Sequence, residues 1–386
     1  MGKHDSRVSD DTVLVHDESH SEGAVSPPIY QTSLFTFESY QAMVDRFSGE
    51  STRPVYSRVD NPTVSVLLEK LCQIEHGESA LAFSSGIAAI SNAILGQVQS
   101  GDRIVCVKHV YPDTYRLLKC ICARFGVTTD FVDGTDLTAI EKALPGARLL
   151  YLESPTTWVM EEQDLKSIAT MAKAEAVTTI VDNSWATPIF QKPLQVGIDL
   201  VVHSASKYIS GHSDTVAGLL VGKQSIVDTL VAETTPYLGA KLSAHEAALL
   251  LRGLRTLPIR LQRHQESALT IARRLAEHRF VTRVYHPGLT PRDYSLLKGY
   301  GGLFSFEIDD AVDIPTFCNS LSLFRLGVSW GGYESLVMPA AASLAQAGEH
   351  SAAVDFGVPP RLIRLFIGLE DPDELWSDLG AAFANA

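Results

Sequence analysis

The chain has 386 residues, of which 45% are hydrophobic and 20% charged, the composition of a globular protein with a large core. At about 150 residues per domain, this length predicts two domains and an extension. The net charge of −13 argues against general binding to nucleic acid or to an anionic membrane, because both need a basic surface. The cysteines lack metal-binding spacing and the N-terminus lacks an apolar leader, so we expect no metal site and a cytoplasmic protein.

Residues 1–63 are polar at first and then mix proline, glycine and aromatic residues with little periodicity. This composition predicts an N-terminal arm that contacts a neighbouring subunit. From residue 64 to 75 the apolar residues follow the i, i+3, i+4 spacing of a helix, which the pair His76-Gly77 ends.

Strand and helix patterns alternate in the next part of the chain. Short apolar runs predict strands at residues 79–83, 103–107, 147–153, 177–182 and 198–204, with a further strand at 218–222. Helical patterns lie between them at 87–95, 115–125 and 164–176. Apolar strands joined by helices predict a mostly parallel sheet covered on both faces, so residues 64–257 are expected to form a large α/β domain.

The C-terminal third has a different pattern. Residues 243–278 form helical stretches that we expect to be interrupted at Pro258, which we take as the boundary between the domains. Apolar runs then predict strands within 280–288, 301–309 and 359–370. Residues 258–386 are therefore expected to form a smaller α+β domain.

Ligands of open α/β sheets bind beyond the carboxyl ends of the parallel strands, so the residues that follow each strand are candidates for a site. They include hydroxyls, carboxylates, an aromatic ring and an amine: Ser84, Ser85, Gly86, Tyr111, Glu153, Asp182, Ser204, Ser206 and Lys207. Each has an ordinary structural explanation when taken alone, such as a helix cap, a turn or a surface lysine. Their convergence on one edge of a sheet is harder to explain in that way.

These residue types together match the needs of pyridoxal 5′-phosphate (PLP). A turn of small residues and glycine before a helix offers free N–H groups to a phosphate. A buried lysine such as Lys207 can form a Schiff base, and Asp182 can pair with a protonated ring nitrogen. Tyr111 can stack on the ring. Trp158 and Trp185 are expected to serve packing.

Several strings resemble the PLP-dependent enzymes of cystathionine (Cys/Met) metabolism, and the resemblance runs from about residue 12 to the C-terminus. They are AVSPPIYQTSLFTF, YSRVDNPT, SSGIAA, ESPTT, VDNSWATP, SASKYISGHSDTVAG, LRGLRTLPIRLQRH, SWGGYESL and RLIRLFIGLED. The resemblance implies a fold-type I enzyme, a PLP cofactor and a homotetramer built as a dimer of dimers. Bacterial cystathionine β-lyases are the closest resemblance.

The resemblance also implies roles for individual residues. Lys207 matches the Schiff-base lysine, Asp182 the partner of the ring nitrogen, and Tyr111 the stacking tyrosine. The positions that match phosphate contacts are Gly86, Ile87, Ser204 and Ser206, together with Tyr56 and Arg58 from the neighbouring subunit. Arg364 matches the arginine that binds the substrate α-carboxylate, and Ser329 matches its helper.

Departures from the family pattern affect the expected reaction. Thr157 replaces an asparagine that contacts the cofactor, and Asp113 stands where methionine γ-lyases carry a cysteine. Val328 replaces the glutamate that γ-acting enzymes usually have before Ser329, and this replacement favours a β-lyase. The string SWGGYESL favours a β-lyase as well. Arg116 favours a γ-synthase instead, because in γ-synthases the matching arginine binds the distal carboxylate of the substrate. The ordinary structural explanation of Arg116 is an exposed arginine on a helix surface.

We therefore expect a carbon–sulfur lyase that performs α,β-elimination on cystathionine or a related cysteine conjugate. The alternative is a γ-replacement or γ-elimination on homoserine esters or cystathionine. A PLP-binding regulator without turnover is a third interpretation, which the intact Lys207, Asp182, Tyr111 and Arg364 oppose.

Overall fold

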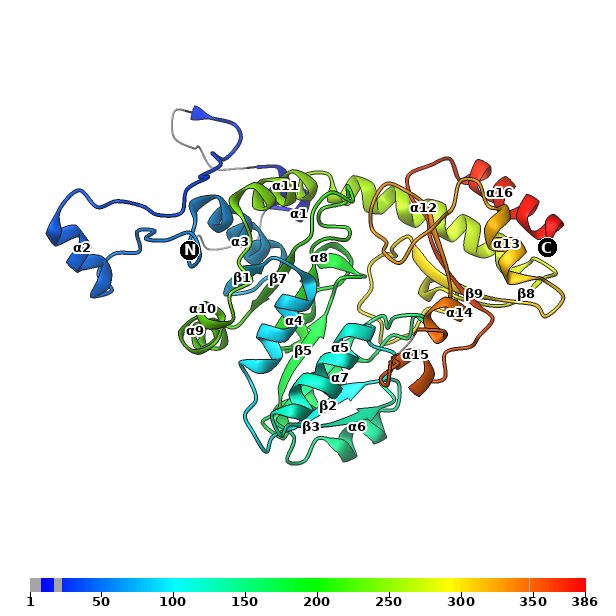
Figure 1. Cartoon of the computed structure of the whole chain (residues 1–386), viewed down its shortest axis with the longest axis horizontal. Coiled ribbons are helices and arrows are strands. Elements are labelled where there is room, and N and C mark those ends of the chain that lie inside the picture. The colour runs from blue at the N-terminus through cyan, green and yellow to red at the C-terminus, as the bar shows by residue number, and fades with distance from the viewer. Residues whose placement is uncertain (1–7, 17–22, 347) are drawn as a thin grey trace.

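The computed structural model describes residues 8–16, 23–346 and 348–386, so residues 1–7 and 17–22 of the predicted arm lie outside the described part. Figure 1 shows a larger and a smaller body, each built around a sheet, and a segment that projects from the larger one. The expected large α/β domain and smaller C-terminal α+β domain are both present, which confirms the fold class.

The larger domain contains a seven-stranded sheet in the order β1-β7-β6-β5-β4-β2-β3. Its strands are β1 (Ser79–Phe83), β2 (Arg103–Val107), β3 (Thr128–Val132), β4 (Leu149–Glu153), β5 (Thr178–Asp182), β6 (Leu200–Ser204) and β7 (Gly218–Gly222). Strands β6, β5, β4, β2 and β3 pair in parallel, whereas β7 is antiparallel to both of its neighbours. The sheet is therefore mostly parallel, as predicted, and β1 runs in the same direction as β6.

The helices of this domain alternate with its strands. They are α3 (Pro62–Glu75), α4 (Gly86–Leu95), α5 (Pro112–Arg116) with the π-helical segment η2 (Leu117–Cys122), α6 (Leu137–Ala143), α7 (Leu165–Ala174), α8 (Thr187–Phe190), η3 (Pro193–Val196), α9 (Gln224–Glu233), α10 (Thr235–Leu238) and α11 (Ala244–Leu254). Helix α3 begins two residues earlier than its apolar pattern, because Asn61 caps it and Pro62 occupies its first turn. His76 ends it in the left-handed conformation.

The smaller domain has a five-stranded sheet in the order β10-β11-β12-β9-β8. The strands are β8 (Val281–Tyr285), β9 (Leu303–Ile308), β10 (Arg325–Leu326), β11 (Leu336–Pro339) and β12 (Leu362–Phe366). The helices are α12 (Leu257–Ala276), η4 (Pro287–Leu289), α13 (Ile314–Ser320), α14 (Ala340–Leu344), α15 (Ala352–Asp355) and α16 (Pro372–Asn385). Among the described residues, no helix is long and apolar enough to cross a membrane.

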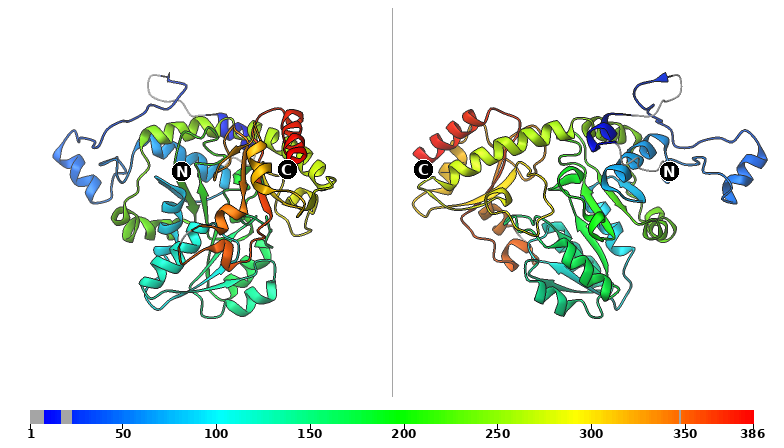
Figure 2. Two further views of the ribbon diagram at one scale, coloured as in Figure 1. Left: turned by 45° about the vertical axis from the view of Figure 1, so that its right-hand side comes forward. Right: turned by 180° about the vertical axis from the view of Figure 1, so that it is seen from behind.

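The helical break lies before Pro258 and not at it. Helix α11 ends at Leu254, and Pro258 lies in the first turn of α12, where its missing N–H removes no helical bond. Leu257 and Leu261 belong to the core of the larger domain, whereas Ile271 and Leu275 belong to that of the smaller one. Helix α12 thus runs from one domain into the other, as Figure 2 shows.

The N-terminal segment has two parts with different surroundings. Helix α1 (Asp10–Val15) packs on α3, where Leu14 is fully buried and the Lys70 amine donates to the carbonyl of Val13 at 2.8 Å. Within residues 23–60, the part that carries α2 (Tyr40–Phe47) projects away from both domains, and α2 has no buried residue (Figures 1 and 2). The ends of this segment contact the larger domain, as Arg58 does at Pro236.

Candidate active site

The sheet brings the predicted strand ends together. Because β1, β6, β5, β4 and β2 all run in one direction, their carboxyl ends lie at the same edge. Contacts between the following loops confirm this convergence. The backbone N–H of Tyr111 after β2 donates to the Glu153 carboxylate at the end of β4 over 2.7 Å, and Gly86 after β1 packs against Ser204 of β6.

Lys207 lies in the turn that follows β6. Its Nζ is 3.4 Å from the Ser204 hydroxyl and 5.7 Å from the ring centroid of Trp330. Burial lowers the pKa of the Lys207 amine, and the nearby Arg364 charge lowers it further against the opposing effect of Asp182. A lowered pKa leaves more of the amine neutral, which is the form that attacks an aldehyde.

Two buried carboxylates lie side by side at the ends of β4 and β5, because Glu153 pairs in register with Asp182. Asp182 accepts the N–H of Ser184 at 2.9 Å, and Glu153 accepts the N–H and hydroxyl of Thr157 at 2.7 and 2.6 Å. Burial raises the pKa of both groups, and the charge of Asp182 raises that of Glu153 further. A cation beside Asp182 would offset the free-energy cost of ionising these buried carboxyl groups, so the pair suits a protonated ring nitrogen.

Tyr111 begins a chain of polar contacts along helix α5. Its hydroxyl donates to Asp113 at 2.8 Å, and the other oxygen of Asp113 accepts from Arg116 at 2.6 Å. Arg116 also donates to Gln346 of the smaller domain. Burial and the bond to Asp113 raise the pKa of the Tyr111 phenol, so it stays protonated.

The N-terminus of α4 lies at the position where the sequence predicts an anion-binding site. Ser85 caps the helix, and the N–H groups of Gly86 and Ile87 lie in its first turn, where a helix offers no acceptor of its own. A Cβ added at Gly86 would lie 2.8 Å from both Cβ and Oγ of Ser204. Only glycine therefore lets the helix approach the Ser204 hydroxyl, as a phosphate cradle requires.

The second predicted serine is engaged elsewhere. The Ser206 hydroxyl donates to the carbonyl of Ala217 at 3.2 Å and accepts its N–H at 2.9 Å. A contact from Ser206 to a phosphate would need this hydroxyl to rotate.

Arg364 of β12 brings the smaller domain to the site. It is 7% exposed, and its Nη2 donates to the carbonyl of Val328 at 2.8 Å. The predicted helper Ser329 follows Val328 directly and is exposed. Burial lowers the pKa of Arg364 to about 10, which still leaves the guanidinium charged at neutral pH. Amine, carboxylates, anion seat and guanidinium together fit PLP and an amino-acid substrate.

Tyr56 and Arg58 are not brought to this cluster within one chain. Tyr56 is 45% exposed and forms an isolated β-bridge with Leu34. Arg58 donates to the carbonyl of Pro236 at 3.0 Å. Their predicted phosphate contact therefore stays a prediction that depends on a second subunit.

Sequence reasoning did not assign roles to several residues of the site. Ser184 accepts the N–H of Ser204 at 2.6 Å, and Glu153 holds the loops after β2 and β4. Trp158 packs in a hydrophobic cluster, as expected, and in addition the Cζ atom of Arg364 lies 4.9 Å from its ring centroid. Alignment of the strand ends would have placed Glu153 beside Asp182, but nothing local in the sequence indicates the position of Trp158.

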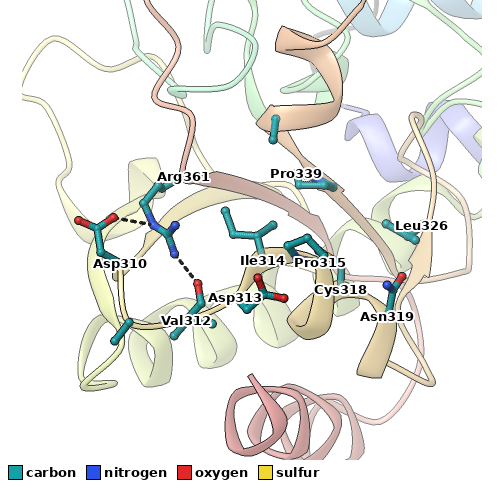
Figure 3. A pocket seen from close by; sticks show the side chains of 12 residues that line it. Asp310, Val312, Asp313, Ile314, Pro315, Cys318, Asn319, Leu326, Pro339 and Arg361 are labelled. Atoms are coloured by element: carbon teal, nitrogen blue, oxygen red, sulfur yellow. Dashed lines mark hydrogen bonds and ion pairs between the residues drawn. The ribbon is translucent and has the colours of Figure 1, made fainter.

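A cavity of about 610 Å³ lies elsewhere, in the smaller domain. Figure 3 shows Arg361 on its wall, where the side chain pairs with Asp310 at 3.1 Å and donates to the carbonyl of Val312 at 2.6 Å. None of the predicted site residues lines this cavity.

Comparison with known proteins identifies the family and supports PLP as its cofactor. Residues 11–384 match the family model of the Cys/Met metabolism PLP-dependent enzymes. The chain is 37% identical to an L-methionine gamma-lyase of Pseudomonas putida, over 95% of this chain and 94% of that one. It is 34% identical to a cystathionine beta-lyase of Lactococcus lactis, over 93% and 94%.

A solved structure shows the same fold. The cystathionine gamma-lyase from Lactobacillus plantarum, complexed with L-serine, superimposes with a TM-score of 0.90 at 35% identity and covers 98% of this chain and 99% of that one. These similarities confirm the fold-type I architecture and the PLP cofactor that the strand-end residues predicted. The chain belongs to the Cys/Met metabolism PLP-dependent enzyme family.

Proposed function

We propose that this protein cleaves the Cβ–S bond of cystathionine, or of a related cysteine conjugate, to a thiol, pyruvate and ammonia. Membership of a family of PLP-dependent lyases supports the reaction class. The choice of a substrate charged at both ends rests on the chain of contacts from Tyr111 through Asp113 to Arg116. The choice of β- over γ-elimination rests on Val328, which stands where γ-acting enzymes usually have a glutamate.

The first consequence of this chain concerns proton transfer. When bound, PLP supplies an electron sink for the carbanion that follows removal of the α-proton. The Lys207 amine, with its lowered pKa, takes that proton. The Cβ–S bond then breaks with its electron pair on sulfur, and the Lys207 ammonium can return the proton it has taken to the leaving thiolate. The Tyr111 phenol stays protonated, because burial and its hydrogen bond to Asp113 raise its pKa. Water converts the remaining three-carbon fragment to pyruvate and ammonia.

The second consequence concerns the substrate. Asp113 and Arg116 place an anion and a cation next to Tyr111, with 46% and 30% of their side chains exposed. The distal end of cystathionine is itself an amino acid, with one ammonium and one carboxylate, so it complements this pair. The methyl group of methionine offers neither charge. The pair thus supports a substrate that is charged at both ends.

A γ-type reaction is the second candidate. It is supported by similarity to the L-methionine gamma-lyase and the cystathionine gamma-lyase, and by Arg116, which suits a distal carboxylate. It needs a further proton removal at Cβ, and the raised pKa keeps the Tyr111 phenol protonated, so Tyr111 does not serve as the base for that step.

Product analysis separates these candidates. The holoenzyme is incubated with cystathionine, cystine, O-succinylhomoserine and methionine, and the keto acids are identified. We expect pyruvate from cystathionine and cystine. Release of 2-oxobutyrate from cystathionine as the main product would overturn the proposal in favour of γ-elimination.

The role of the charged pair is tested with Arg116→Ala and two substrates, cystathionine and S-ethylcysteine, which lacks a charged distal end. Loss of one charged hydrogen bond, worth about 1.5–3 kcal/mol, should raise KM for cystathionine at least about tenfold and leave S-ethylcysteine nearly unchanged. Arg124→Ala, at an exposed position past η2, is the matched control. Equal small effects on both substrates would show that Arg116 is an exposed surface residue that does not bind the substrate.

We also propose that a second copy of the chain completes the site with Tyr56 and Arg58. The projecting segment supports this, because it carries many exposed apolar side chains: Val25, Ile29, Tyr30, Leu34, Tyr40, Met43, Val44, Phe47, Tyr56 and Val59. Apolar surface of this extent marks a contact with another protein. A tetramer and a cytoplasmic location remain predictions.

A further inference from the structure

Trp158 joins the two domains beside the active site. It lies in the loop after β4 of the larger domain and is 3% exposed. The other buried members of its hydrophobic cluster all come from the smaller domain: Ala340, Ala353, Val358 and Leu362. The side chain therefore inserts from one domain into the other.

The backbone of Trp158 adopts a conformation that bulky residues rarely take. Its φ is 70°, in the left-handed region, where a tryptophan is strained. The preceding residue is held in place, because both the N–H and the hydroxyl of Thr157 donate to Glu153. Strain of this kind persists where the surrounding structure fixes it, and it gathers at functional sites.

The face of the indole ring meets a buried cation. The Cζ atom of Arg364 is 4.9 Å from the ring centroid of Trp158. Leu362 and Arg364 are two residues apart on β12, so both point to the same face of the strand, and Leu362 belongs to the Trp158 cluster. Strand β12 thus presents the guanidinium to the ring.

Hydrogen bonding does not explain why a tryptophan occupies this position. Its Nε1 is buried and has no hydrogen-bond partner among the described residues, which is unfavourable for an N–H donor. The ring face, in contrast, contacts a cation that burial has deprived of water, and such contacts are strongest when desolvated.

We propose that Trp158 is a positioning residue that holds the guanidinium of Arg364 in the orientation that binds the substrate α-carboxylate. The inference rests on the role proposed for Arg364. Without the ring, Arg364 keeps its bond to Val328 but loses the surface that fixes the plane of its other donors.

The test measures binding of two small probes to the holoenzyme through the absorbance of the cofactor. L-Alanine carries an α-carboxylate and no leaving group, and ethylamine has the same skeleton without the carboxylate. Trp158→Leu keeps apolar bulk and removes the ring face, whereas Trp158→Phe keeps a ring face and removes the N–H. Trp158→Met serves where the leucine variant does not fold, because methionine adapts to irregular cavities.

We expect Trp158→Leu to raise the Kd of L-alanine about 2- to 30-fold and to leave ethylamine unchanged, with a smaller effect for Trp158→Phe. In an Arg364→Met background, Trp158→Leu should cause no further loss. Equal weakening of both probes, or a loss that persists in that background, would show that Trp158 only fills space and would overturn the inference. If Arg364→Met itself weakens both probes alike, the role proposed for Arg364 fails as well.

Discussion

Burial and neighbouring charge prepare individual residues of the site for chemistry. Burial disfavours the charged forms of Lys207, Asp182 and Glu153, so it lowers the pKa of the amine and raises those of the carboxylates. The same burial strengthens the interaction of each group with a charged ligand. A bound ligand of opposite charge therefore stabilises the charged forms of these buried groups more than it would stabilise exposed ones.

Asp182 offers a direct test at this scale. Asp182→Asn should lower kcat at least about 100-fold while cofactor content changes little, because the variant removes charge from beside the ring but leaves the Lys207 anchor intact. Asp182→Glu keeps the charge and should retain more activity. Cofactor is measured by absorbance and activity by release of keto acid. Loss of cofactor in parallel with activity would assign Asp182 to cofactor retention instead.

Lys207, Asp182 and Gly86 could be predicted from the sequence because each lies at or shortly after the end of an apolar strand, whereas Arg364, which lies within β12, was indicated only by the family resemblance. Lys207, Asp182 and Gly86 lie at the sheet edge as expected. The positions of Trp158 and Asp113 could not be predicted in this way, because their contacts with Arg364 and Tyr111 depend on loop geometry and on how the domains meet.

At the level of elements, the strands with a continuous apolar run were predicted, including β1 and β8 at the edges of their sheets, whereas β3, β10 and β11 were not. Strand β3 has the residues TTDFV, is largely exposed and pairs only with β2, so it lacks a continuous apolar run. Helix α6 and the strands β10 and β11 were also not predicted; β10 has only two residues and the interior strand β11 only four, too few for a recognisable pattern. The predicted helix 115–125 begins earlier, at Pro112, and includes a π-helical segment that has no apolar signature.

A buried histidine on helix α12 makes the free energy of unfolding depend on pH. His264 on this helix is fully buried, and burial lowers its pKa from 6.5 to about 4. The folded state therefore favours the neutral ring. The contribution of His264 to the free energy of unfolding is largest above pH 6.5 and falls by on the order of 3 kcal/mol as the pH drops towards 4.

Replacement of His264 should remove this dependence. His264→Asn keeps a donor for the carbonyl of Ile367, which the ring contacts at 2.8 Å, but does not titrate. Melting temperatures between pH 7.5 and 4.5 should fall less steeply in this variant than in wild type. The exposed His245→Asn is the control. Identical slopes in all three proteins would show that His264 does not contribute to acid sensitivity.

At the level of the whole molecule, the site takes residues from both domains and, in our proposal, from a second subunit. Arg58→Ala and Lys207→Ala should each be inactive alone. After mixing and reassembly, about one quarter of the wild-type activity should return, because half of the dimers are hybrids and one of their two sites has both residues. Hybrids that form and stay inactive would indicate a site contained within one subunit.

The edge of the large sheet is, in our proposal, the catalytic site, and Lys207 is its reactive amine. Borohydride reduction of the holoenzyme, followed by digestion and mass spectrometry, tests it most directly. We expect the mass of the reduced cofactor on the peptide that contains Lys207 and not on any peptide of Lys207→Ala. Cofactor fixed to a different lysine, or retained covalently by Lys207→Ala, would contradict it.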